Sequence, residues 1–142
     1  MILTDSSFLV AFFNENDNQH LRAIGDMKKY DEEKQEFLVT EHILGETATV
    51  LLYRNGVVAA KEFLDFAQEK CTVQRWESED MHATLKRFKE QKYEISYIDA
   101  SIVYLAKFLH LPVACYDENI LKEINDPHPR GVGYSRPRTR LV

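Results

Sequence analysis

The chain has 142 residues, a length that fits one domain with a buried core, and its 44% hydrophobic and 29% charged residues are ordinary for a globular protein. These values exclude a wholly disordered chain, and no stretch approaches the roughly 20 apolar residues of a membrane span. The net charge is −5, which divides into +3 over residues 126–142 and −8 over residues 1–125. An acidic body is not typical of a general nucleic-acid binder, but it suits a protein that gathers carboxylates around a cation.

Residues 1–125 alternate between predicted strands and predicted helices. Short apolar runs predict strands at 2–4, 37–40, 72–76 and 111–116. Apolar residues at helical spacing predict helices at about 6–13, 20–30, 42–54, 58–67, 79–91, 98–109 and 119–124. Strands separated by helices imply right-handed crossovers, so we expect an α/β fold of three layers with a central parallel sheet of about four to five strands.

The last segment, residues 126–142, differs from the rest in composition. It is rich in proline and arginine, which argues against a helix and predicts an extended arm or a disordered end. We therefore divide the chain into a domain at 1–125 and a C-terminal arm at 126–142. The two cysteines, Cys71 and Cys115, have no zinc-site or disulfide spacing and are predicted to be buried thiols. The N-terminus carries no signal peptide pattern, so we expect a cytoplasmic protein.

Four acidic residues follow or precede the predicted strands, and three of them have an ordinary structural explanation. Asp5 and Asp117 stand directly after the first and fourth strands, where an aspartate commonly caps the next helix. Asp99 comes three residues after Ser96, a spacing that predicts a capping box. Glu46 lies in an apolar stretch with no basic residue three or four positions away, although a solvent-facing position remains open to it.

Taken together, the four acids predict more than helix capping. Ligands bind open parallel sheets at the carboxyl ends of the strands, so the acids converge if the first and fourth strands are neighbours. Clustered carboxylates repel one another and need a cation to be stable, and a set of oxygen ligands favours Mg²⁺ or Mn²⁺ over zinc. Such a site can hydrolyse phosphodiesters without a serine, cysteine or histidine nucleophile.

The four motifs resemble those of PIN-domain ribonucleases, in the same order along residues 1–125. The family is characterised by an opening strand with an Asp-Ser/Thr-Ser turn, a glutamate on the helix after the second strand, an Asp-Ala helix start, and a final strand that ends in Asp. The matching segments here are 2–10 with Asp5, 40–46 with Glu46, 95–102 with Asp99, and 111–117 with Asp117. Within the family, the segments look like those of the compact toxins of toxin–antitoxin pairs, the VapC-like proteins.

The resemblance implies a Mg²⁺- or Mn²⁺-dependent endoribonuclease that leaves a 5′-phosphate and a 3′-hydroxyl, a homodimer, and an antitoxin partner. It also implies that Asp5, Asp99 and Asp117 ligate the metal, while Glu46 holds a water of the metal or deprotonates the attacking one. Ser7 matches a hydroxyl that helps to position the site. The chain has Cys115 where the family usually has Thr, and Asn119 where it often has another acid, so a second metal is in question.

RNA binding needs basic residues, and the candidates are Arg75 and the arm residues Arg130, Arg136, Arg138 and Arg140. Two further interpretations of the sequence stay open. One is a PIN-fold module that binds RNA or protein without cutting it, which the change at Asn119 allows. The other is an RNA-processing nuclease of the same family that has no connection with toxins.

Overall fold

A computed structural model describes residues 1–127 of the chain. Its four strands, in chain order, are β1 (Ile2–Thr4), β2 (Phe37–Thr40), β3 (Cys71–Gln74) and β4 (Val113–Ala114). The helices are α1 (Ser6–Phe13), α2 (His20–Glu32), α3 (Glu41–Asn55), α4 (Val57–Lys70), α5 (Ser78–Lys89), α6 (Tyr97–Leu109) and α7 (Glu118–Asn125). Every predicted element is present, with ends that differ by a few residues. None of the described helices has the length and apolar character needed to cross a membrane.

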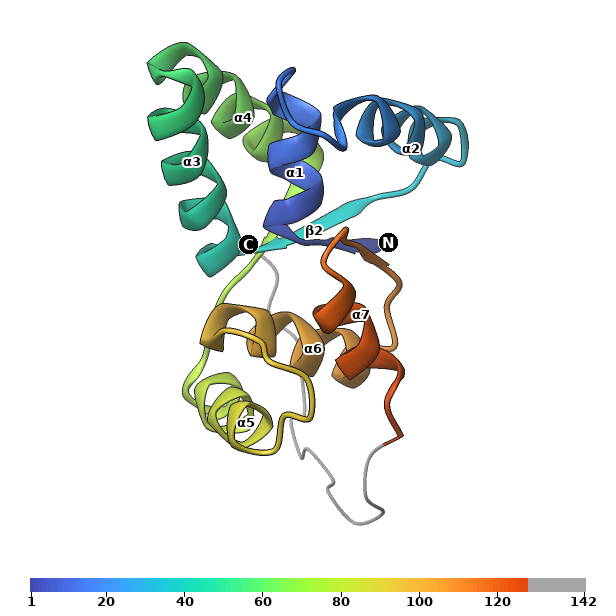
Figure 1. The fold of residues 1–142 in the computed structure, drawn as a ribbon, viewed down its shortest axis with the longest axis vertical. Helices are drawn as coiled ribbons and strands as arrows, with labels where there is room; N and C mark the ends of the chain where they lie inside the picture. Colours follow the sequence, from blue (N-terminus) through green and yellow to red (C-terminus); the bar gives the residue numbers. More distant parts are fainter. Residues whose placement is uncertain (128–142) are drawn as a thin grey trace.

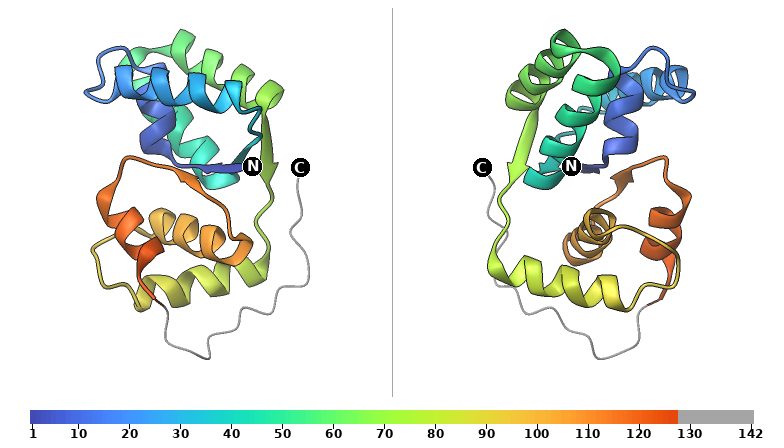
Figure 2. Two further views of the ribbon diagram at one scale, coloured as in Figure 1. Left: turned by 90° about the vertical axis from the view of Figure 1, so that its right-hand side faces the viewer. Right: turned by 60° about the vertical axis from the view of Figure 1, so that its left-hand side comes forward.

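The strands form one parallel sheet in the order β3-β2-β1-β4, which confirms the three-layer α/β/α prediction. The chain moves outward from β1 to β2 to β3 and then returns across the sheet to place β4 on the other side of β1. Because crossovers between parallel strands are right-handed as a rule, a reversal of direction puts the two groups of connecting helices on opposite faces. Figures 1 and 2 show α1 to α4 on one face, and α5 to α7 on the other.

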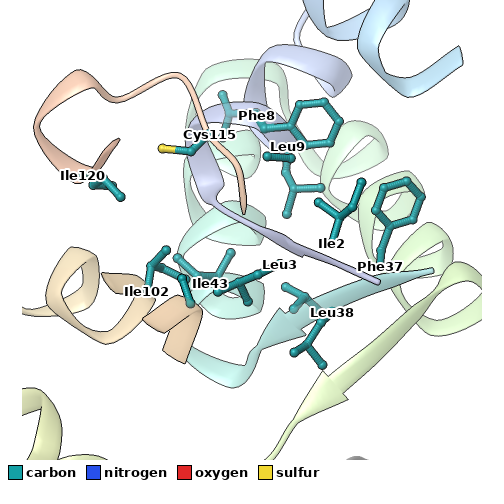
Figure 3. Close-up of a cluster of buried hydrophobic side chains, with 14 of the residues drawn as sticks. Ile2, Leu3, Phe8, Leu9, Phe37, Leu38, Ile43, Ile102, Cys115 and Ile120 are labelled. Carbon is teal, nitrogen blue, oxygen red and sulfur yellow. The ribbon is translucent and has the colours of Figure 1, made fainter. Parts of the chain in front are cut away.

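The central strand β1 is buried on both sides. Ile2 pairs with Phe37 and Leu3 pairs with Leu38, so each pair points to one face of the sheet. Figure 3 shows Ile2 on the side of α1 and Leu3 on the opposite side, toward Ile102 of α6. This is why Ile2 and Leu3 are both apolar, with no alternation between apolar and polar residues.

The fourth strand is shorter than predicted. The sequence predicts strand over 111–116, whereas only Val113–Ala114 pair with β1. Beyond Ala114 the backbone leaves the ladder, because the N–H of Tyr116 donates to Ser7 Oγ at 2.9 Å instead of to a neighbouring strand. The shortened strand therefore turns toward the start of α1, and it carries Asp117 with it.

The buried position of Leu3 gives a test of the sheet. Replacing Leu3, which is fully buried, with alanine should lower the free energy of unfolding by about 2–5 kcal/mol, because it leaves a cavity at the centre of the sheet. Leu21→Ala is the matched control: Leu21 is 84% exposed, and its change should stay within about 0.5 kcal/mol. Chemical denaturation measures both, and equal effects would contradict the assigned positions.

Candidate metal centre

The carboxyl ends of β1 and β4 meet at the point where the strand order reverses. The two strands pair at Leu3 with Val113 and at Thr4 with Ala114, and the N–H of Asp5 donates to the carbonyl of Ala114 at 3.0 Å. The expectation that the first and fourth strands are neighbours is therefore confirmed. Asp5 and Asp117 each follow one of these strand ends, in the crevice where open parallel sheets bind ligands.

Asp5 is buried and uses only one of its two carboxylate oxygens in the protein. Oδ2 accepts hydrogen bonds from the backbone N–H of Ser7 at 3.1 Å, from Ser7 Oγ at 2.6 Å and from Cys115 Sγ at 3.5 Å. Oδ1 is equally buried and has no hydrogen-bond partner within residues 1–127. Burial raises the pKa of Asp5, the hydrogen bonds from Ser7 oppose this, and the charge of Asp99 adds to it.

Glu46 lies in the second turn of α3 and points into the same region. It is half-buried, and among the described residues nothing bonds to its buried oxygen Oε2. Burial raises the pKa of Glu46 and is the largest cause of the shift. The charges of Asp5 and Asp99 raise this pKa further, whereas a hydrogen bond with the Ser6 side chain lowers it. The side chains of Asp5, Glu46 and Asp99 therefore lie close enough for their charges to act on one another.

The ordinary capping roles predicted for the acids are all present. Asp5 caps α1, as the contacts with Ser7 show. Asp99 Oδ2 accepts the N–H of Ser96 at 3.0 Å, while its own N–H donates to Ser96 Oγ, which completes the capping box of α6. Asp117 Oδ1 accepts the N–H groups of Asn119 and Ile120 at 2.9 and 3.2 Å, and so caps α7. In each aspartate, the cap engages a single oxygen.

Ser7 and Cys115 hold the strand ends together, and Asn119 ties α7 to the segment before α6. Ser7 Oγ links Asp5 to the backbone of Tyr116, so the hydroxyl bridges the ends of β1 and β4. Cys115 Sγ accepts the N–H of Asp117 at 3.3 Å and lies against Asp5, and burial raises the pKa of this thiol to about 12. The side-chain amide of Asn119 donates to the carbonyl of Glu94 at 2.9 Å, which connects α7 to the segment before α6.

The donor set fits a hard divalent cation. Two buried carboxylate oxygens, on Asp5 and Glu46, are without hydrogen-bond partners in the described part of the chain, and an unpaired buried acceptor is costly unless something binds it. None of the four acids makes an ion pair within residues 1–127 that could neutralise it. In the same range, however, no group of three or more His, Cys, Asp or Glu side chains is already arranged to hold an ion.

Sequence reasoning missed one part of this region, a depression of about 420 Å³ beside the acids. Glu46 and Asp117 line it together with Arg54, a residue that was not among the candidates. A usable signal was present, because Arg54 follows Glu46 by eight residues and therefore stands about two helical turns further along α3. The candidate Arg75 instead follows β3, which β2 separates from β1, and the arm residues Arg130, Arg136, Arg138 and Arg140 lie outside the described residues.

Comparisons with known proteins agree with this architecture. The sequence model of the PIN domain family matches residues 2–126. Among curated proteins, none matches the sequence significantly. The structure is similar to the crystal structure of Mycobacterium tuberculosis VapC20, described as a sarcin-ricin loop cleaving toxin, with a TM-score of 0.75 and 21% sequence identity over 86% of this chain and 94% of that one.

The raised pKa values predict how the metal-free protein responds to pH. A carboxyl group whose pKa is raised on folding binds its proton more tightly in the folded state, so its contribution to stability falls as the pH rises from the ordinary value through the raised one. The free energy of unfolding in EDTA should therefore fall less steeply with pH in Asp5→Asn than in the natural chain. At pH 7 the amide variant should be the more stable, as measured by denaturant titration.

Added Mg²⁺ should reverse this order. At a hundred times its dissociation constant, a bound ion stabilises the folded state by about 2.7 kcal/mol. The natural chain should gain about this much, and Asp5→Asn should gain clearly less because it loses a charged ligand. Equal stabilisation of the two proteins by Mg²⁺, or a metal-free Asp5→Asn protein that is less stable at pH 7, would contradict a cation site at Asp5.

Proposed function

Because the chain belongs to the PIN-domain family, we propose that it is an endoribonuclease that hydrolyses RNA phosphodiester bonds with Mg²⁺ or Mn²⁺. The observation that carries the proposal is the convergence of unpaired carboxylates at the β1–β4 crevice. Asp5, Glu46 and Asp99 are electrostatically coupled although they come from three distant segments, and the fourth acid follows the strand paired with β1. A fold gains nothing from such repulsion unless a cation offsets it.

In this proposal Asp5, Asp99 and Asp117 hold the ion, each through the oxygen that its capping hydrogen bonds leave unused. When bound, the ion would lower the pKa of a water and stabilise the charge that develops on the phosphate oxygens. Ser7 and Cys115 keep Asp5 in place, because both donate to the oxygen that does not face the ion. Asn119 contributes to the position of Asp117 rather than to the charge of the site.

Glu46 is the proposed general base. Its raised pKa keeps it a better proton acceptor than an ordinary glutamate, and its oxygen Oε2 is not occupied by another described residue. A water oriented by Glu46 forms a new bond to phosphorus and gives its proton to the carboxylate. The bond from phosphorus to the 3′ oxygen breaks, and that oxygen takes up a proton to leave a 3′-hydroxyl and a 5′-phosphate.

We extend the proposal to a VapC-like toxin of the cytoplasm, which acts as a homodimer and is inhibited by an antitoxin protein. Its support is the similarity in fold to VapC20, a toxin that cleaves the sarcin-ricin loop. The exposure of large apolar side chains also favours protein partners: Leu21 of α2 and Tyr53 of α3 are each 84% exposed, and Val58 of α4 is 70% exposed. An RNA-processing role without an antitoxin would need the same four acids.

The alternative is a PIN-fold module that binds RNA or protein without hydrolysing RNA. The observation in its favour is Asn119, which brings no charge and whose amide is already bonded to the Glu94 carbonyl. A module of this kind would still bind an ion or RNA, so only a measurement of turnover separates it from the nuclease.

The deciding experiment is cleavage of a panel of structured RNAs by purified protein in Mg²⁺, in Mn²⁺ and in EDTA. We expect cleavage that needs the metal. We also expect Asp99→Asn to lower the rate by at least two orders of magnitude, because it loses a charged ligand while its remaining oxygen can be retained for the capping box of α6. Asp65→Asn, an exposed change on α4 that is distant in the sequence from the four acids, is the control and should cut at the normal rate.

The same assay extends to Asp5→Asn, Glu46→Gln and Asp117→Asn, each of which should show a comparable loss. A variant that keeps nearly full activity would remove its residue from the site. If folded protein free of a bound inhibitor cuts no RNA in either metal, the binding-module interpretation replaces the nuclease.

A further inference from the structure

The depression of about 420 Å³ that is lined by two of the four acids, here called the α1–α3 depression, has a size within the range of sites for small ligands. Its walls come from α1, from the loop after α1 that carries Asp17 and Gln19, from α3 and from the residues after β4. Glu46 and Asp117 stand on the side of the proposed metal centre, and Val10 and Val50 give it an apolar surface. The depression therefore continues the acidic crevice along α3, away from the strand ends.

Arg54 lines this depression beyond Val50. Glu46, Val50 and Arg54 follow one another at intervals of four residues, so all three lie along one side of α3, and all three line the depression. Eight residues of helix correspond to about 12 Å along the axis between Glu46 and Arg54. The acid and the arginine thus occupy two separate points of one continuous surface.

Arg54 is exposed and makes no ion pair or hydrogen bond with any other described residue, even though Asp17 lines the same depression. It is also the only basic side chain that lines the depression within residues 1–127. One structural role is open to it, because a cation in the last turn of a helix interacts favourably with the helix dipole. That role explains a positive charge at the end of α3, but not why the charge borders a depression shared with two of the acids.

We propose that the α1–α3 depression binds an unpaired nucleotide next to the scissile phosphate, and that Arg54 binds a phosphate of the same strand. This rests on the proposed function, since the scissile phosphate is placed by the four acids and their ion. The planar guanidinium matches phosphate oxygens through two parallel hydrogen bonds. An RNA strand held at the ion and again at Arg54 runs along α3 over Val50. We expect this strand to be unpaired, because proteins recognise RNA bases mostly in single-stranded segments.

The test measures binding rather than cleavage. A short fluorescent single-stranded RNA oligonucleotide of mixed sequence is titrated with Asp99→Asn protein in Mg²⁺ at several salt concentrations, and fluorescence anisotropy gives the affinity. Adding Arg54→Ala should weaken binding roughly tenfold, as expected for a lost hydrogen-bonded charge. The slope of log affinity against log salt should decrease in magnitude by about 0.7, the value for one phosphate contact with a single strand.

Two variants separate the proposed contact from a structural role. Arg54→Lys keeps the charge and loses the two-pronged geometry, so it should keep the salt slope and recover part of the affinity. Lys29→Ala removes one exposed positive charge from the last turn of α2, and it should change neither quantity. If Arg54 acted only on the helix dipole, Arg54→Ala would lower thermal stability and leave the salt slope of RNA binding unchanged, which would overturn the proposal.

Failure of the nuclease and failure of this inference give different results. Metal-dependent cutting by Arg54→Ala with an unaltered KM, together with an unaltered binding slope, would overturn only the role of Arg54. Binding of the oligonucleotide that depends on Arg54, by a protein that cuts nothing, would overturn the nuclease and support the RNA contact. No measurable binding of the oligonucleotide by the protein with Arg54 intact would overturn the proposed nucleotide site.

Discussion

The parallel pairing of β1 with β4 is the contact on which the site depends. These strands are separated by more than a hundred residues, and only the pairs Leu3 with Val113 and Thr4 with Ala114 hold them in register. Ser7 adds a side-chain bridge beyond the last pair, because its hydroxyl bonds both to Asp5 and to the backbone of Tyr116. A shift of one residue in this register would turn each side chain of β4 to the other face of the sheet and move Asp117 away from Asp5.

Clustering of the acids conflicts with the burial that the fold requires. Asp5 follows a strand that is buried on both faces, and it is only 2% exposed. Water cannot stabilise its charge there, and the charge of Asp99 adds to the unfavourable field. The fold tolerates the conflict because the aspartates accept hydrogen bonds from backbone N–H groups at the starts of α1, α6 and α7. These hydrogen bonds replace part of the hydration that the carboxylates lose on folding. A cation would offset the destabilisation that these hydrogen bonds leave, so its binding would stabilise the fold and create the site at the same time.

The sequence predicted the elements and the three aspartate caps well because those signals are local. An aspartate after an apolar run, or three residues after a serine, can be recognised without knowing the fold, and all three predicted caps are present. The length of β4 and the depression that Arg54 lines were not predictable in this way, because they depend on contacts between distant segments. Glu123 is a further example: its buried carboxylate accepts the N–H groups of Lys92 and Tyr93, and so fixes the segment that leads to Asp99.

The capping and catalytic explanations of the aspartates are not alternatives. A carboxylate has two oxygens, and Asp5, Asp99 and Asp117 each accept their capping hydrogen bonds through one of them. The hydrogen bonds fix the direction of the second oxygen, so in the proposed site the start of each helix would orient a metal ligand as well as ending a strand or a loop. An amide preserves an acceptor for the cap and removes the charge, whereas alanine removes both. It follows that amide variants at these three positions can separate the chemistry of the site from the stability of the helices that carry it.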